Sequence, residues 1–140
     1  MNRCWQICVI LGAMVLAGCS STVADGTVVT VLYSSETRGK IEGCGCKHNG
    51  GGITKRAAKI REARTADDRA VYCDAGNFLS GTPEIDNSNG SIAVAAHNYM
   101  GTNVINVSER ELALGMDAFK SAKQAAKFKL VSANIRSNGS

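Results

Sequence analysis

Proline and aromatic residues are scarce in this chain of 140 residues, which has one proline and an aromatic content of 5%. A single proline excludes a proline-rich linker, and three phenylalanines are too few for a platform on which nucleic-acid bases stack. The chain also has little excess of charge of one sign, since its formal net charge is +4. This charge is too small, and the basic residues are too scattered, for electrostatic binding of nucleic acid. Hydrophobic residues make up 44%, which is typical of a globular chain, and the length fits one domain.

Hydrophobic runs long enough to cross a membrane are absent as well. The apolar segment Ile7–Leu16 follows Arg3 and is shorter than the ~20 residues that a transmembrane helix needs. It continues into the motif LAGC, which ends at Cys19 and resembles the lipobox of bacterial lipoproteins. The resemblance implies that residues 1–18 are a signal peptide and that Cys19 is lipidated. A plain secretory signal cleaved near Ala24 is the alternative.

A lipid on Cys19 implies a place in the bacterial cell envelope. An acyl chain such as palmitate would anchor the protein to the membrane with its domain facing the periplasm. Ser20 favours the outer membrane in a Gram-negative cell. Residues 19–26 are small and polar and are typical of a short tether. We therefore expect one domain over residues 27–140.

Strand-like and helix-like segments alternate along this domain. We expect strands at 27–33, 70–73, 103–107 and 128–133, and helices at 53–64, 92–100 and 116–127. Asn89 or Ser91 is the expected N-cap of the second helix, and residues 74–88 are expected to form a turn-rich loop. This order predicts an α/β fold, a layered and largely parallel sheet with flanking helices, whose sites lie in the loops after the strands.

Three of those loops contain side chains that can carry chemistry. They hold Glu36, Arg38, Cys44, Cys46 and His48 after the first strand, Asp74, Asn77 and Ser80 after the second, and Ser108, Glu109, Arg110 and Glu111 after the third. Parallel neighbouring strands would bring the three loops to one edge of the sheet. The alternative is that they are ordinary polar connections, because loops are polar by default.

A set of short motifs falls in a characteristic order over residues 27–135. The set consists of Gly39, Gly51-Gly52, Asp74-Ala75-Gly76, Gly81-Thr82-Pro83, Glu111, Gly115 and Ser132-Ala133-Asn134. The order resembles the N-terminal half of the 5′-nucleotidase group of calcineurin-like metallophosphoesterases. The resemblance implies part of an αββα sandwich, phosphoester hydrolysis and a divalent-metal cofactor. The sequence stops just after the fourth strand, so we expect a truncated product with one sheet face lacking its partner.

The metal-ligand positions of that family carry other residues in this chain. Glu36 lies where the family has its first metal-binding Asp, and Arg38 lies where it has a metal-binding His. Asn77 replaces the Asp that bridges the two metals, and Glu109-Arg110 replaces an Asn-His pair. A guanidinium stays protonated and cannot ligate a cation, and Asn77 lacks the charge that bridges two cations. At most Glu36, Asn77 and Glu109 could still contact a metal. We therefore expect no standard dinuclear centre and negligible phosphomonoesterase activity, and we assign no catalytic residue.

Two functions follow as hypotheses. The first is a lipid-anchored phosphoesterase related to 5′-nucleotidases. The second is a non-catalytic protein on the same scaffold, which binds a partner or a phosphate-containing small molecule through Arg38 and Arg110. In a purely structural alternative, Glu36, Glu109 and Glu111 neutralise the two arginines in an ion-pair cluster.

Three cysteines lie outside the leader and the lipobox. The segment Cys44-Gly45-Cys46-Lys47-His48, together with Cys73, could hold a soft metal ion. A disulfide is the alternative, and an oxidising envelope favours it. The Cys-x-x-Cys spacing of thioredoxin-like and haem-binding proteins is missing. His97 lies in an expected helix and is interpreted as a core or surface residue.

Overall fold

The computed structural model of the chain describes residues 26, 28–45, 47 and 50–136. The helices and strands of this part occur in the order β1 (Val31–Ser34), α2 (Ile53–Ala66), β2 (Val71–Asp74), α3 (Pro83–Asn87), α4 (Ser91–Met100), β3 (Val104–Asn106), α5 (Glu109–Leu112), α6 (Met116–Ala125) and β4 (Lys129–Val131). None of the described helices is long and apolar enough to cross a membrane.

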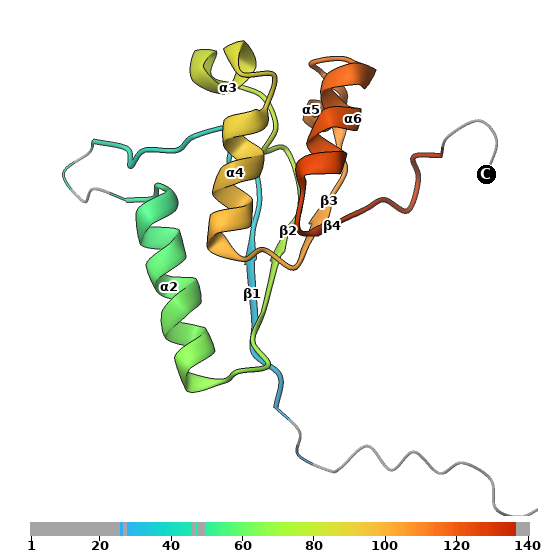
Figure 1. Cartoon of the computed structure of the whole chain (residues 1–140). Coiled ribbons are helices and arrows are strands. Elements are labelled where there is room, and N and C mark those ends of the chain that lie inside the picture. The colour runs from blue at the N-terminus through green and yellow to red at the C-terminus, as the bar shows by residue number, and fades with distance from the viewer. Residues whose placement is uncertain (1–25, 27, 46, 48–49, 137–140) are drawn as a thin grey trace, which may run out of the picture.

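The four strands form one parallel sheet in the order β1-β2-β3-β4. Each crossover contains one of the long helices, and α2, α4 and α6 lie side by side on one face of the sheet (Figure 1). This arrangement confirms the expected α/β fold with its parallel sheet and flanking helices. It also confirms that the loops after β1, β2 and β3 leave the same edge of the sheet.

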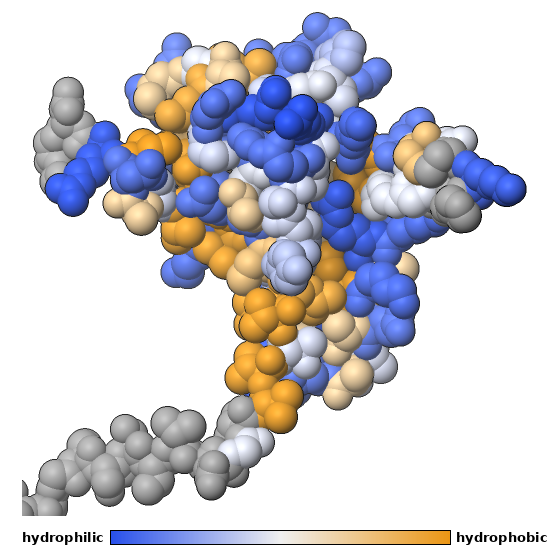
Figure 2. All heavy atoms as spheres, turned by 180° about the vertical axis from the view of Figure 1, so that it is seen from behind, coloured by the Kyte–Doolittle hydropathy of each residue, from blue (hydrophilic) through white to orange (hydrophobic). Residues whose placement is uncertain are grey.

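The core lies between the sheet and these helices. Tyr72 of β2 and Ile105 of β3 point into it and are 2% and 0% exposed, because alternate residues of a strand face opposite sides of the sheet. On the opposite face, Val31 and Tyr33 of β1 are 57% and 86% exposed. Figure 2 shows apolar side chains gathered over this side of the molecule. The expected apolar sheet face is therefore present in the part of the chain that the structure describes.

Two short helices lie where loops were expected. Helix α3 interrupts the predicted loop over residues 74–88, and α5 lies in the third loop. Pro83 stands in the first turn of α3, where its fixed φ angle suits a helix and its missing N–H is not needed. The prediction of a loop over residues 74–88 is therefore wrong for residues 83–87, which form α3.

The predicted N-cap of α4 is also wrong, because Gly90 takes that position in place of Asn89 or Ser91. Gly90 has a left-handed φ of 78°. A Cβ atom on this residue would stand 2.6 Å from Cδ1 of Leu79. Close packing against the core therefore selects glycine over a side chain that could cap the helix. The expected end of this helix at residue 100 is confirmed, and Gly101 follows it with a left-handed backbone.

His97 of α4 is a core residue, 3% exposed. Its ring lies 4.7 Å from the ring of Phe78 and 5.8 Å from that of Phe128, measured between centroids. Its Nδ1 atom is 3.0 Å from Oγ1 of Thr102. Burial first, and the charge of Arg56 second, lower the pKa of His97 from 6.5 to about 4.

This pKa predicts that the protein loses stability in mild acid. Above about pH 6.5 His97 is neutral in both states, whereas between 6.5 and 4 only the unfolded chain takes up the proton. The free energy of unfolding should therefore fall by about 3 kcal/mol as the pH drops through this range. Urea unfolding of the wild type and of His97→Gln at a series of pH values measures it. An equally steep acid dependence in His97→Gln would assign the loss to other groups.

Candidate functional site

Backbone hydrogen bonds join the first two loops at the carboxyl edge of the sheet. The backbone N–H of Glu36 donates to the carbonyl of Gly76 at 3.2 Å, and that of Arg38 donates to the carbonyl of Asn77 at 2.8 Å. Glu36, Arg38 and Asn77 all have left-handed φ angles, of 54°, 47° and 63°. Such angles cost about 1–3 kcal/mol in a residue other than glycine. The cross-loop bonds hold the three residues in this conformation.

The carboxylate of Glu36 accepts hydrogen bonds from two neighbouring side chains. It accepts a hydrogen bond from Nδ2 of Asn77 at one oxygen, and the guanidinium Nε of Arg38 lies 2.9 Å from the other. The pKa of Glu36 is lowered first by the bond from Asn77, then by Arg38, and further by the charge of Arg110. All of these contacts stabilise the ionised carboxylate.

The amide of Asn77 has one orientation that satisfies its neighbours. Its Oδ1 atom accepts a hydrogen bond from the backbone N–H of Arg110 at 3.4 Å and lies 2.9 Å from Oγ of Ser108. A backbone N–H can only donate, so the amide oxygen faces α5 and the amide nitrogen faces Glu36. Asn77 thereby connects the first loop to the third.

Glu111 holds the second and third loops together and is fully buried, with 0% exposure. One carboxylate oxygen accepts the N–H groups of Phe78 at 2.8 Å and Leu79 at 3.4 Å. The other accepts the N–H groups of Ser108 at 2.8 Å and Asn77 at 3.2 Å, and the hydroxyl of Ser108 at 2.5 Å. Ser108 and Glu111 form a capping box at the start of α5.

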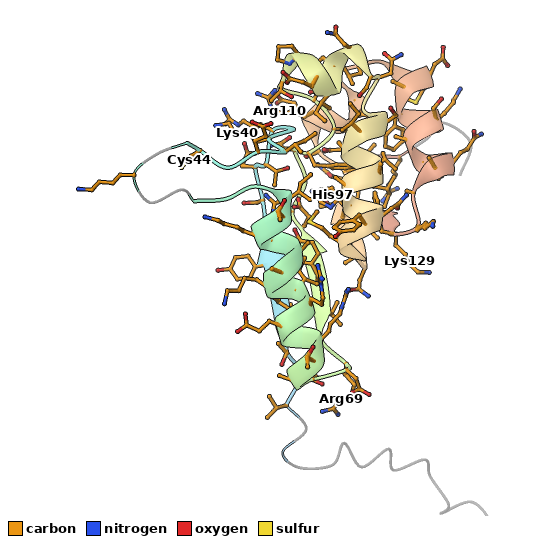
Figure 3. All side chains as sticks on the ribbon, turned by 60° about the vertical axis from the view of Figure 1, so that its left-hand side comes forward. Lys40, Cys44, Arg69, His97, Arg110 and Lys129 are labelled. Atoms are coloured by element: carbon orange, nitrogen blue, oxygen red, sulfur yellow. The ribbon has the colours of Figure 1, made fainter. Side chains whose placement is uncertain are left out.

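The ion-pair cluster considered for the arginines is therefore realised only in part. Arg38 pairs with Glu36, whereas Glu111 is used by backbone N–H groups. Arg110 is half-buried, and within the described ranges its guanidinium has no ion pair or hydrogen bond. Glu109 is exposed and stands beside it in sequence. Figure 3 shows Arg110 at the same end of the molecule as Lys40.

Asp74 is a second buried carboxylate at this edge, 3% exposed. It accepts hydrogen bonds from the hydroxyl of Ser34 and from the backbone N–H of Gly76, the latter at 2.8 Å. The Ser34 hydroxyl is in turn 2.6 Å from the hydroxyl of Tyr72. Ser34 and Tyr72 were not among the residues singled out from the sequence, because neither lies in a loop motif. Asp74 thus shapes the turn after β2.

An open cavity of about 650 Å³ lies beside Glu36. Its walls come from the first loop, the start of α2 and the start of α3, and they include Glu36, Lys40 and Arg56. Cys44 also lines it and is disulfide-bonded, whereas Cys73 of β2 has a free thiol. A disulfide-bonded Cys44 offers no thiolate to a metal, which favours the disulfide alternative at this residue. Cys46 and His48 lie outside the described residues, so the soft-metal hypothesis stays untested for them.

The described residues of this edge contain no cluster of metal ligands. Two-metal sites need several carboxylate or imidazole ligands within reach of both ions. Among the residues that the structure describes, no three His, Cys, Asp or Glu side chains stand close enough to hold one ion. The carboxylates of Glu36, Asp74 and Glu111 are instead engaged by donors of the protein itself.

Comparison with known proteins gives a consistent fold. No family model matches the chain. A snake venom 5′-nucleotidase of Gloydius brevicauda is 27% identical over 139 residues, which cover 94% of this chain and 24% of that protein. The solved 5′-nucleotidase precursor of Thermus thermophilus superposes with a TM-score of 0.68 at 21% identity, over 76% of this chain and 22% of that one.

A calcineurin-like phosphoesterase of Bacillus subtilis superposes with a TM-score of 0.63 at 15% identity, over 79% of this chain and 38% of that one. The chain therefore spans about a quarter of the length of the 5′-nucleotidases that it matches. The chain therefore shares the arrangement of helices and strands of these 5′-nucleotidases and calcineurin-like phosphoesterases.

Proposed function

We propose a function for this chain from the premise that it has the 5′-nucleotidase-like scaffold of the calcineurin-like phosphoesterases. The chain is a lipid-anchored protein of the bacterial envelope that binds a phosphate-containing small molecule at the carboxyl edge of its sheet without hydrolysing it. The observation that carries this proposal is Arg110, a half-buried cation at that edge whose guanidinium makes no ion pair or hydrogen bond in the described part of the chain.

The chemistry of a phosphate anion suits this position. A guanidinium binds phosphate through two parallel N–H···O bonds, which a lysine cannot make. The carboxylate of Glu36 attracts Arg110 through its charge but forms its hydrogen bonds with Asn77 and Arg38, so the guanidinium donors of Arg110 stay available. The open cavity beside Glu36 and Lys40 leaves room for the rest of a small molecule.

A phosphate titration tests the anion site. At constant ionic strength, we expect the melting temperature to rise with phosphate and to saturate, corresponding to about 2.7 kcal/mol at a hundredfold excess over Kd. Arg110→Ala should abolish the rise. Arg61→Ala, which removes an exposed arginine of α2, should keep it. If phosphate leaves the wild type unchanged, the edge is a structural cluster and not an anion site.

Hydrolysis is the second candidate function, and the scaffold favours it. The curated relative of this chain is a 5′-nucleotidase, and the solved structures include a phosphoesterase. Metal-activated water would then attack the phosphorus atom. The arginines at positions 38 and 110 oppose this candidate, since each stands where the resemblance places a neutral ligand.

Lipidation of Cys19 is tested on the mature protein. We expect the N-terminal peptide from a bacterial envelope fraction to begin at Cys19 and to carry acyl chains, because the box follows an apolar segment of signal-peptide length. Cys19→Ser should stay unprocessed and without lipid, whereas Cys8→Ser should be processed normally. Mass spectrometry of that peptide decides the matter. An unmodified N-terminus at any later residue would contradict the anchor.

A further inference from the structure

The face of the sheet opposite the helices carries almost no charge. Tyr72 and Ile105 point toward the helices, and the alternation of side chains along each strand places eight others on the opposite face. They are Val31, Tyr33, Val71, Cys73, Val104, Asn106, Lys129 and Val131. We call these eight residues the open face. Six of them are apolar, and Figure 2 shows apolar side chains gathered on this side of the molecule.

The strand register defines one row across the open face. Tyr33 pairs with Cys73, Cys73 with Val104 and Val104 with Lys129, so these four residues lie level on β1, β2, β3 and β4. Tyr33 is 86% exposed and Lys129 is exposed, whereas Cys73 and Val104 between them are half-buried. Neighbouring strands are about 4.8 Å apart, so Tyr33 and Lys129 stand about 14 Å apart at the two ends of the row.

Lys129 is the one charged side chain among the eight residues. In the described part of the chain its ammonium group has no ion pair or hydrogen bond. The other polar side chain, Asn106, donates a hydrogen bond from Nδ2 to the carbonyl of Ala75 at 3.2 Å. A partner of the open face therefore has to bring apolar surface and one group that attracts a cation.

A second copy of the chain meets both requirements. A two-fold axis parallel to the strands, between β2 and β3, places β1 of one copy over β4 of the other. Tyr33 then lies over Lys129 of the second copy, and the face of its ring attracts the ammonium group. The symmetry repeats this contact, and Cys73 and Val104 of both copies meet near the axis. Sheets pack face to face in this aligned way in β-sandwiches.

An axis at right angles to the strands is less favourable. It places β4 over β4, which brings the two Lys129 side chains to the same edge of the interface, where like charges repel. It also turns the second copy end over end, so the two β1 strands begin at opposite ends of the dimer. The axis parallel to the strands keeps both beginnings at one end, which also suits two copies anchored in one membrane.

We infer that the open face is the interface of a homodimer in which Tyr33 of each copy packs against Lys129 of the other. The inference does not depend on the proposed phosphate site, because that site lies in the loops after the strands and not on the open face. In the dimer the two carboxyl edges lie at the same end, so both sites open in the same direction.

Sedimentation equilibrium of the full-length chain in density-matched detergent tests the interface. We expect the mass of the wild type to rise with protein concentration from that of one chain to that of two. Tyr33→Lys should weaken dimerisation about a hundredfold, because a loss of about tenfold per aromatic contact occurs twice in a symmetric dimer. Tyr99→Lys, which changes an exposed tyrosine of α4, should stay within about twofold of the wild type.

A charge-reversed pair identifies the arrangement of the two copies. Lys129→Glu alone should weaken the dimer, because it removes the cation from the ring of Tyr33. Combined with Tyr33→Lys, it should recover at least about tenfold of the affinity that Tyr33→Lys loses, since opposite charges then meet across the interface. Within one chain the two positions are about 14 Å apart, so a contact inside the chain does not produce this recovery.

Cys73 reports whether the open face is covered, because its thiol is free. Alkylation of Cys73, followed in its own peptide by mass spectrometry, should slow as the wild type dimerises and should not slow in Tyr33→Lys. A chain that stays monomeric at every concentration overturns the inference, whether Cys73 is open or covered by something else. A dimer in which Cys73 reacts at the monomer rate also overturns it, since the copies then join elsewhere. Tyr33 is exposed in the single chain, so thermal melts of Tyr33→Lys should match those of the wild-type monomer.

Discussion

Glu111→Ala should destabilise the protein by about 4 kcal/mol, the largest effect that we expect from a single side chain of the site. The carboxylate is fully buried and accepts hydrogen bonds from four backbone N–H groups and one hydroxyl. Truncation leaves these donors without an acceptor in a region that water does not reach. A buried donor that loses its partner costs roughly 1–3 kcal/mol.

Two further variants make this result specific. Glu111→Gln keeps one acceptor oxygen and should lose about half as much stability, because its NH₂ group faces donors at the other position. Glu109→Ala removes an exposed carboxylate two residues away and should stay within about 0.5 kcal/mol of the wild type. Urea unfolding followed by circular dichroism measures all three. Equal midpoints for Glu111→Ala and Glu109→Ala would show that Glu111 does not hold the loops together.

The order of strands and helices was predictable because it depends on local patterns. The continuous β-branched run around Val31 is typical of a strand, and α2 is long enough to be recognised as a helix, with Ala57 and Ile60 facing the core. The parallel order of the sheet then follows from the helical crossovers, and with it the meeting of three loops at one edge. Helices α3 and α5, of five and four residues, are too short to show a helical period.

The hydrogen bonds of the site were only partly predictable from the sequence. Ser108 and Glu111 have the spacing of a capping box, so this part of the site is encoded in the local sequence. The bonds from Glu111 to Phe78 and Leu79 join residues more than thirty positions apart, which no local pattern encodes. Left-handed backbone at Glu36 and Arg38 also has no signature, because neither residue type favours it.

The second large effect concerns catalysis. A dinuclear phosphoesterase owes its rate to metal ions that activate water and neutralise the charge of the transition state. Such catalysis amounts to many orders of magnitude over the uncatalysed reaction, at least about 10⁶-fold. In this chain the positive charge at the edge comes from the side chains of Arg38 and Arg110. Asn77 donates a hydrogen bond to Glu36 through its amide nitrogen. The proposed function, in which no pair of ions is bound, therefore predicts that nearly all of that enhancement is lost.

The most direct measurement is the hydrolysis of a nucleoside monophosphate by the full-length chain with added Mn²⁺ or Zn²⁺. Our account predicts a rate equal to that of buffer with the same metal, both for the wild type and for Asn77→Ala. Asn87→Ala, which changes an exposed asparagine of α3, serves as the matched control. Metal-dependent hydrolysis that Asn77→Ala abolishes and Asn87→Ala retains would contradict the account and establish a metal-dependent active site at this edge.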